Sequence, residues 1–443
     1  MTTLKNIFGG NLQQYTMVLA LVLLAVTFNV ISGGRMLTPS NLQNLISGNA
    51  YVLILAIGMV MVIVVGHIDL SVGSVAGFVG MVTAITTTQY GWPWWVGLLA
   101  GLLTGVVIGA WHGFWLAKIG IPGFITTLAG MMIFRGLVIW VSRSISVPVP
   151  SEFSVLGAGY LPEWGPAFTG MNNSTLLLGL LAAAWFVWTE IGRRRDATDL
   201  PVWITAVRIV LVLAVIGYLT FLFGTGRPGT SFPVPGLILV GLVIVYHVLT
   251  QRTPFGRHIY AVGGNKAAAA LSGVNTGRVY FLVMLNMSFL AAVAGILFVG
   301  RATAAGPSDG TMWELDAIAA VFIGGAAVSG GIGTVTGSMI GGLVMAVLNN
   351  GLMLMGVGQD QTQVIKGLVL LAAVAFDVLN KQQGRPSLLG HLMRSAGRDA
   401  GPAPAATAPA ATASAAATDA AVTSVPVSAG PVDAADTLPP RSS

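Results

Sequence analysis

The chain has 443 residues, of which 55% are hydrophobic and only 8% are charged, and its formal net charge is +6. Soluble domains carry roughly 25% charged residues, so this chain has too few charges to cover a water-facing surface of its size. A soluble enzyme is therefore excluded. The apolar runs are continuous and long, whereas a transmembrane β-barrel shows short alternating segments. We predict an all-α polytopic membrane protein.

A helix needs about 20 apolar residues to cross the hydrocarbon core of a bilayer. By this criterion we expect about 12 transmembrane helices, within a range of roughly 10–12. Two of the segments, 72–88 and 317–329, are short and rich in small residues, which indicates broken or partial spans. The expected spans are 15–31, 50–66, 72–88, 93–117, 124–141, 174–191, 203–223, 236–250, 280–300, 317–329, 334–355 and 363–379.

Lysine and arginine indicate the orientation, because they concentrate in cytoplasmic loops. With the N-terminus inside, most of the 21 basic residues fall on the cytoplasmic side, and those that fall outside are Arg35, Arg143, Arg227 and Arg301. Both termini are therefore predicted to be cytoplasmic. The expected organisation is an N-terminal segment (1–14), a membrane domain (15–381) and a cytoplasmic, largely disordered Ala/Pro/Thr-rich tail (382–443). We interpret the first span as a retained helix, not a cleaved signal peptide.

Sequence motifs for catalysis are absent. The chain has no cysteine, no G-x-x-x-x-G-K-[ST] phosphate loop, and five histidines without the spacing of metal ligands. We therefore expect no catalytic residue, no metal and no cofactor in this chain. Its basic residues lie in short loops between apolar runs, so no nucleic-acid partner is expected.

Two stretches interrupt the apolar runs with acidic and small residues. In the first, we interpret Asp69 as a helix N-cap, or as part of a broken helix that lines a solute path together with Ser71. In the second, Glu314 and Asp316 precede another short helix. The two short helices run in opposite directions in the predicted topology. We therefore hypothesise an inverted repeat that pairs the third span with the tenth.

The longest predicted cytoplasmic loop, residues 251–278, carries its own helix signal. Asn265 can cap a short helix that runs to Leu271, and Gly273 can end it. A short exposed helix suits docking of a cytosolic partner, and the alternative is an ordinary connector. The glycine-dense segment 324–342 indicates either close helix packing or a hinge.

Polar side chains recur in the later spans. Asn286, Asn349 and Asn350 are expected to hydrogen-bond across helices or to meet the hydroxyl groups of a solute. Lys366, near the start of the last span, is expected to extend to the outer interface. Ionisable residues within the spans are few, which argues against a proton relay.

Several of these motifs together resemble one family. Residues 68–74, 256–275, 317–334 and 348–352 are similar, in this order, to monosaccharide ABC-importer permeases of the ribose/xylose type. The similarity extends over about 41–381, and the membrane domain (15–381) is then a permease domain. The resemblance implies a subunit of the bacterial inner membrane that provides the translocation pathway and leaves ATP hydrolysis to a partner.

The implied partners are a cytosolic ABC ATPase, an extracytoplasmic sugar-binding protein, a second permease copy in a homodimer, and the lipid bilayer. By the same resemblance, the coupling loop (251–278) would contact the ATPase through Gly263, Gly264, Asn265, Ala268, Leu271, Ser272 and Gly273. The candidates for the translocation path are Asp69, Ser71, Asn286, Glu314, Asp316, Asn349 and Asn350.

Two extra spans, 174–191 and 203–223, distinguish the chain from the shorter ribose-type permeases and resemble the xylose and multiple-monosaccharide branch. Xylose is therefore the favoured substrate, and ribose or a furanosyl signalling molecule is the alternative within the same role. The alternative from another class is an ion-coupled secondary sugar transporter. The scarcity of carboxylates within the spans and the long cytoplasmic loop argue against it.

Overall fold

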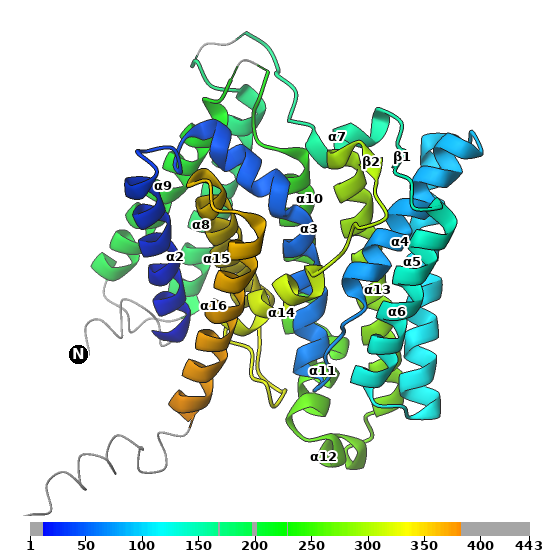
Figure 1. Cartoon of the computed structure of the whole chain (residues 1–443). Helices are drawn as coiled ribbons and strands as arrows, with labels where there is room; N and C mark the ends of the chain where they lie inside the picture. Colours follow the sequence, from blue (N-terminus) through cyan, green and yellow to red (C-terminus); the bar gives the residue numbers. More distant parts are fainter. Residues whose placement is uncertain (1–11, 167–168, 197–201, 228, 382–443) are drawn as a thin grey trace, which may run out of the picture. The chain divides into compact units, whose positions relative to one another are not determined.

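The computed structural model describes residues 12–166, 169–196, 202–227 and 229–381, and these are mostly helical (Figure 1). Residues 1–11 of the predicted N-terminal segment and the whole predicted tail lie outside the described residues. Within the described ranges, one pair of short antiparallel strands forms, with β1 (Val147–Pro148) against β2 (Ala304–Ala305). The predicted all-α class of polytopic membrane protein is confirmed.

Ten long helices form most of the described chain. They are α2 (Leu12–Ile31), α3 (Pro39–Val64), α5 (Trp94–Phe114), α6 (Gly123–Ser142), α8 (Asn173–Asp196), α9 (Val202–Gly224), α10 (Val234–Arg252), α13 (Thr276–Ala302), α15 (Val335–Leu354) and α16 (Gln359–Lys381). The shorter helices are α4 (Val72–Ala84), α7 (Glu152–Ala158), α11 (Pro254–Gly264), α12 (Lys266–Leu271) and α14 (Trp313–Ile323). Single π-helical turns, Ile85–Gln89 and Trp115–Ile119, extend α4 and α5.

Eight of the described helices are long and apolar enough to cross a membrane, which is fewer than the 12 spans expected. Each expected span coincides with a described helix, but α4 and α14 have only 13 and 11 residues. The expected bounds 317–329 are wrong, because the helix begins at Trp313 and ends at Ile323. Gly324 and Gly325 follow, and the positive φ of Gly325 turns the chain out of the helix.

The centre of the described bundle is built on α3 and α13, the two longest helices, which pack against each other. Most residues of both helices are buried, and α4, α5 and α7 also pack on α13. A helix that is apolar around its whole circumference is stable only when it is surrounded by protein or lipid. These two helices therefore form the scaffold that positions the other elements.

A stripe of glycines brings α5 against α13. Gly101, Gly105 and Gly109 recur every fourth residue and therefore lie on one face of the helix. A Cβ atom added at Gly105 or Gly109 would collide with the backbone of α13 at Ser288 or Leu285. Small residues at this spacing let membrane helices approach closely, so the abundance of glycine reflects backbone packing here.

The two helices of the expected spans 174–191 and 203–223, α8 and α9, pack mainly on each other, and α9 also contacts α3. Glu190 of α8 is buried and accepts a hydrogen bond from Arg208 of α9 at 3.2 Å. A buried ion pair holds two helices in one register, because separating them would leave an uncompensated charge. None of the described residues of this hairpin lines the cavity between α3, α14, α15 and α16.

Candidate functional site

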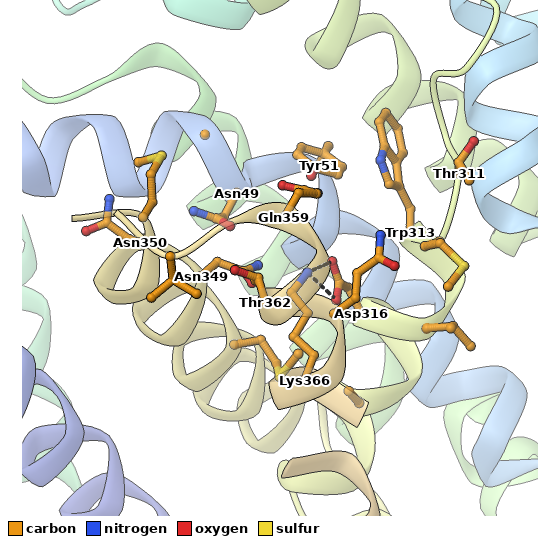
Figure 2. A pocket seen from close by; sticks show the side chains of 18 of the residues that line it. Asn49, Tyr51, Thr311, Trp313, Asp316, Asn349, Asn350, Gln359, Thr362 and Lys366 are labelled. Carbon is orange, nitrogen blue, oxygen red and sulfur yellow. Dashed lines mark hydrogen bonds and ion pairs between the residues drawn. The ribbon is translucent and has the colours of Figure 1, made fainter. Parts of the chain in front are cut away.

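A cavity of about 640 Å³, here called the polar cavity, lies between α3, α14, α15 and α16 and is lined by polar and apolar side chains (Figure 2). The first turns of α3, α14 and α16 and the last turns of α15 line it. Its volume lies within the roughly 300–1,000 Å³ typical of small-molecule sites. Its polar and aromatic lining residues are Asn41, Asn44, Asn49, Tyr51, Arg301, Thr311, Trp313, Asp316, Asn349, Asn350, Gln359, Thr362, Gln363 and Lys366.

An ion pair forms one wall of the cavity (Figure 2). The Nζ atom of Lys366 on α16 lies 3.0 and 2.9 Å from the two carboxylate oxygens of Asp316 on α14. The expectation that Lys366 extends to the outer interface is wrong, because its ammonium group has a carboxylate partner within the bundle. Asp316 also differs from its expected position before the helix, since α14 already begins at Trp313.

Amide side chains connect α3 with α15 at the same cavity. Asn41 and Asn350 exchange two hydrogen bonds, at 2.8 and 3.1 Å. The expected bonding across helices is therefore found for Asn350. The neighbouring Asn349 lines the cavity, and its buried Oδ1 atom has no hydrogen-bond partner in the described part of the chain. This oxygen is buried, so it is an unpaired acceptor within the cavity wall and is not exposed to the cavity itself.

An aromatic cluster supports a second part of the cavity wall. The ring of Trp313 lies 4.2 Å from that of Tyr51 and 4.5 Å from that of Phe298, measured between centroids. Trp313 and Tyr51 line the cavity, and Trp313 is otherwise buried. Packing on two rings restricts the indole to one orientation.

Asp69 and Ser71 lie in the first break, residues 65–71, which separates α3 from α4. The Oδ1 atom of Asp69 accepts hydrogen bonds from the backbone N–H of Ser71 at 2.8 Å and from its hydroxyl at 2.6 Å. The predicted N-cap at Asp69 is wrong in position, because Ser71 precedes the first residue of α4. Asp69 instead fixes the turn that leads into the helix, and only 1% of it is exposed.

We expect Asp69→Leu to destabilise the protein and Asp69→Asn to be much milder. Leucine leaves two buried donors of Ser71 without an acceptor, at a cost of about 1–3 kcal/mol for each buried group. Asparagine keeps an oxygen at the same position. Thermal unfolding of the two purified variants measures the difference. Equal loss in the two variants would show that the charge matters and that the turn does not.

The remaining path candidates lie apart from the cavity. The Oδ1 atom of Asn286 on α13 accepts a hydrogen bond from the Tyr246 hydroxyl of α10 at 2.5 Å. Glu314 turns toward α4, where its carboxylate lies against Gly73. Of the seven candidates, the structure therefore brings Asp316, Asn349 and Asn350 together on the cavity. It places Asp69, Ser71, Asn286 and Glu314 elsewhere.

The coupling loop folds into two helices, α11 and α12, where the sequence predicts one. Asn265 caps α12 as predicted, since its Oδ1 accepts from the N–H of Ala268 at 3.0 Å. Gly273 follows the end of this helix with a φ of +83°. Among the coupling candidates, Gly264, Asn265, Ala268, Leu271, Ser272 and Gly273 are exposed, and Gly263 is half-buried. Leu271 is 91% exposed.

The end of α11 contacts Val64, the last residue of α3 directly before the first break, and also the second break, residues 324–334, between α14 and α15. A Cβ atom at Gly263 would collide with the backbone oxygen of Val64 and lie 2.9 Å from the nitrogen of Gly331. The N–H of Gly331 donates to the Val64 oxygen at 2.8 Å. Three chain segments therefore meet backbone to backbone at one point.

Tyr260 adds a second connection between α11 and the second break. Its hydroxyl donates to the backbone oxygen of Gly333 at 2.7 Å. Burial raises the pKa of Tyr260, and the hydrogen bond from Gln251 partly opposes this rise. The phenol therefore remains protonated at neutral pH and keeps donating.

Both interpretations of the glycine-dense segment find support in different parts of it. Gly337 and Gly341 on α15 contact the backbone of α14 so closely that a Cβ atom would collide, which is helix packing. Gly330 and Gly331 have positive φ and form the second break. The packing interpretation holds for the helix, and the hinge remains a hypothesis for the loop.

Sequence reasoning missed several residues of the cavity. Asn41, Asn44 and Asn49 lie in the polar first turns of α3, before the expected span 50–66, so the sequence placed them outside the membrane helices. Trp313, Tyr51 and Lys366 gave no signal for function, because aromatic residues and a lysine near a span end are ordinary at membrane interfaces.

The fold and the cavity define a class: a polytopic helical transport protein with two broken helices and a polar solute cavity. The chain belongs to the family described as "Branched-chain amino acid transport system / permease component", whose model matches residues 41–374. This match covers the whole bundle from α3 to most of α16.

Three curated relatives specify the similarity. The chain is 37% identical over 380 residues to the xylose transport system permease protein XylH of Escherichia coli strain K12, covering 84% of this chain and 93% of the relative. It is 37% identical over 379 residues to XylH of Haemophilus influenzae, covering 84% and 98%. It is 32% identical over 373 residues to the ribose import permease protein RbsC of Escherichia coli strain K12, covering 84% and 95%. No solved structure matches the chain significantly.

These comparisons confirm the resemblance to ribose/xylose-type permeases that the sequence motifs indicate. The chain is a multi-pass permease subunit of the inner membrane and is not an enzyme.

Proposed function

We propose that this permease provides the pathway of an ATP-driven monosaccharide importer, with xylose as the favoured substrate. The observation that carries the proposal is the 37% identity to xylose permeases over 84% of the chain. The polar cavity supports it, because amides, an ion pair and aromatic rings are suitable partners for a polyhydroxylated solute. Ribose and a furanosyl signalling molecule remain alternatives within the same role.

We propose a cytosolic ABC ATPase and an extracytoplasmic sugar-binding protein as partners, with a second copy of the permease completing a homodimer. In this assembly the binding protein delivers sugar to the side of the cavity, and the ATPase contacts α11 and α12. Each ligand shifts the permease between conformations only through its differential affinity for them.

We also propose a topology with both termini cytoplasmic and 12 membrane-embedded helical segments. The coupling loop then faces the cytoplasm, and the cavity opens toward the outside. In this arrangement α4 and α14 are the short third and tenth segments of an inverted repeat. The long helices α3 and α13 support the pairing, because each directly precedes one of the two short helices.

The mechanical route runs from α12 through α11 to the two breaks. When the ATPase displaces α11, Gly263 moves against Val64 and Gly331, so both breaks receive the displacement together. A second chain of contacts also leads from α12 to the first break. The Nζ atom of Lys266 on α12 lies 5.1 Å from the centre of the Tyr280 ring, and this ring packs edge-on against His67 in the first break. The contacts support α11 as the element that transmits motion.

We expect Tyr260→Phe to reduce coupled transport without removing it. The variant loses one hydrogen bond, worth about 0.5–1.5 kcal/mol, and keeps the ring in place. Uptake should fall a few-fold relative to ATP hydrolysis, and the measurement is sugar transported per ATP hydrolysed. If the number of sugar molecules transported per ATP hydrolysed is unchanged, the Tyr260 hydroxyl does not take part in transmitting motion from α11 to the second break.

The substrate is tested with the purified complex of permease, ATPase and binding protein in liposomes. Uptake is measured for a panel of labelled monosaccharides that contains xylose, ribose, arabinose, galactose and glucose. The proposal predicts uptake of xylose at the highest specificity. Uptake of an amino acid and of no monosaccharide would overturn it.

An ion-coupled secondary sugar transporter is the second candidate function. One observation favours it: the structure buries Asp69, Glu314 and Asp316, so carboxylates within the bundle are more numerous than the sequence indicates. The names of the relatives and the exposed coupling loop support the importer instead.

A further inference from the structure

We infer that the polar cavity between α3, α14, α15 and α16 binds one monosaccharide within the permease itself, with Trp313 against the sugar ring and Asp316 and Lys366 bonded to its hydroxyl groups. This inference rests on the proposed function and names the residues that would recognise the substrate. It starts from geometry, since these side chains converge on one open cavity of about 640 Å³ (Figure 2).

Sugar hydroxyls both donate and accept hydrogen bonds, so a site for them needs both kinds of partner. An ammonium group has three N–H donors, and Lys366 directs two of them at Asp316, so one remains for a solute. The carboxylate of Asp316 retains further acceptor capacity.

The aromatic wall fits the other feature of a monosaccharide, the apolar face formed by its C–H groups. Trp313 presents a large ring that Tyr51 and Phe298 hold in place. A rigid ring beside a few fixed polar groups is a common way to orient a small ligand. Preorganisation reduces the entropy lost on binding, although a transport site must also release its ligand.

An aliphatic amino acid fits the cavity less well. Its carboxylate and ammonium groups would have to displace the partners in the Asp316–Lys366 pair, which already satisfy each other at 2.9 and 3.0 Å. The remaining lining combines the amides of Asn41, Asn44 and Asn49 with apolar side chains such as Leu315, Met345 and Leu370, so the discrimination against an amino acid rests on the ion pair.

The chain has no cysteine, so a cysteine introduced by mutation is the one thiol of this chain that a maleimide can label. We would introduce Thr362→Cys on the cavity wall, and Ser151→Cys at an exposed position outside the cavity as the matched control. The full complex is treated with a water-soluble maleimide, with xylose, leucine or glycine betaine at equal osmolality. The rate of labelling is the readout.

Xylose should slow the labelling of Thr362→Cys about tenfold at saturation and leave Ser151→Cys unchanged, while leucine and betaine should have no effect. Absence of labelling, or equal rates with and without xylose, would overturn the inference. If the unmodified complex imports xylose but xylose gives no protection, the cavity assignment fails and the proposed function stands. If leucine protects and no monosaccharide is imported, both fail.

Three variants separate recognition from folding. Trp313→Ala should raise the half-protecting xylose concentration about tenfold, and Trp313→Phe should restore most of the affinity. The double variant Asp316→Asn with Lys366→Gln keeps an amide pair in place of the ion pair and avoids a lone buried charge. It should weaken protection similarly while thermal stability is retained. Full protection in the double variant would remove the ion pair from the site.

Discussion

Leu271→Asp is expected to reduce ATP-dependent uptake about 100-fold or more, while the permease still inserts and folds normally. Leu271 is a large apolar side chain with 91% exposure at the end of α12, and it has no structural task in the described bundle. If it inserts into a pocket of the ATPase, a buried carboxylate would cost several kcal/mol, in the range of about 2–4 kcal/mol seen for interface hot spots.

The measurement is co-purification of the ATPase with the tagged permease, together with uptake in liposomes. Leu271→Met is the matched control, because it preserves apolar volume and should keep nearly full activity. Normal co-purification and uptake with Leu271→Asp would show that the ATPase docks elsewhere.

Gly263→Val is expected to abolish coupled uptake, whereas Gly264→Ala should be tolerated. A Cβ atom at Gly263 collides with the backbone of Val64, so α11 must move away from both breaks. Overpacking of this kind typically costs about 1–3 kcal/mol and shifts the backbone. Nothing lies within 4 Å of a Cβ atom at Gly264, the next residue along the chain.

ATP hydrolysis and sugar uptake are measured in parallel for this pair of variants. We expect Gly263→Val to hydrolyse ATP without moving sugar, because the ATPase still docks on α12. Comparable uptake in both variants would contradict the route through the Gly263 contact.

Part of this structure follows from sequence reasoning. The apolar segments predict the helices because burial in lipid requires continuous internal hydrogen bonding. Asn265 predicts the start of α12, since capping is a local interaction between a side chain and a backbone three residues away. The short spans around α4 and α14 also follow from local composition.

The cavity could not be predicted, because it depends on contacts between distant segments. Asn41 and Asn350 are 309 residues apart, and the partners Asp316 and Lys366 lie on different helices. No local pattern indicates that Lys366 turns inward, since a lysine near a span end usually extends to the interface. Likewise, the meeting of Gly263, Val64 and Gly331 depends on tertiary packing alone.

The central claim is that ATP hydrolysis by a partner drives uptake through this chain. Measuring which energy source drives uptake tests this claim most directly. Labelled xylose uptake is compared between liposomes that hold this chain alone under an imposed proton or sodium gradient and liposomes that hold the complete complex with ATP inside and outside. We predict accumulation only in the complex, dependent on ATP hydrolysis and on the binding protein. Accumulation of xylose by the chain alone, driven by an ion gradient, would contradict the account.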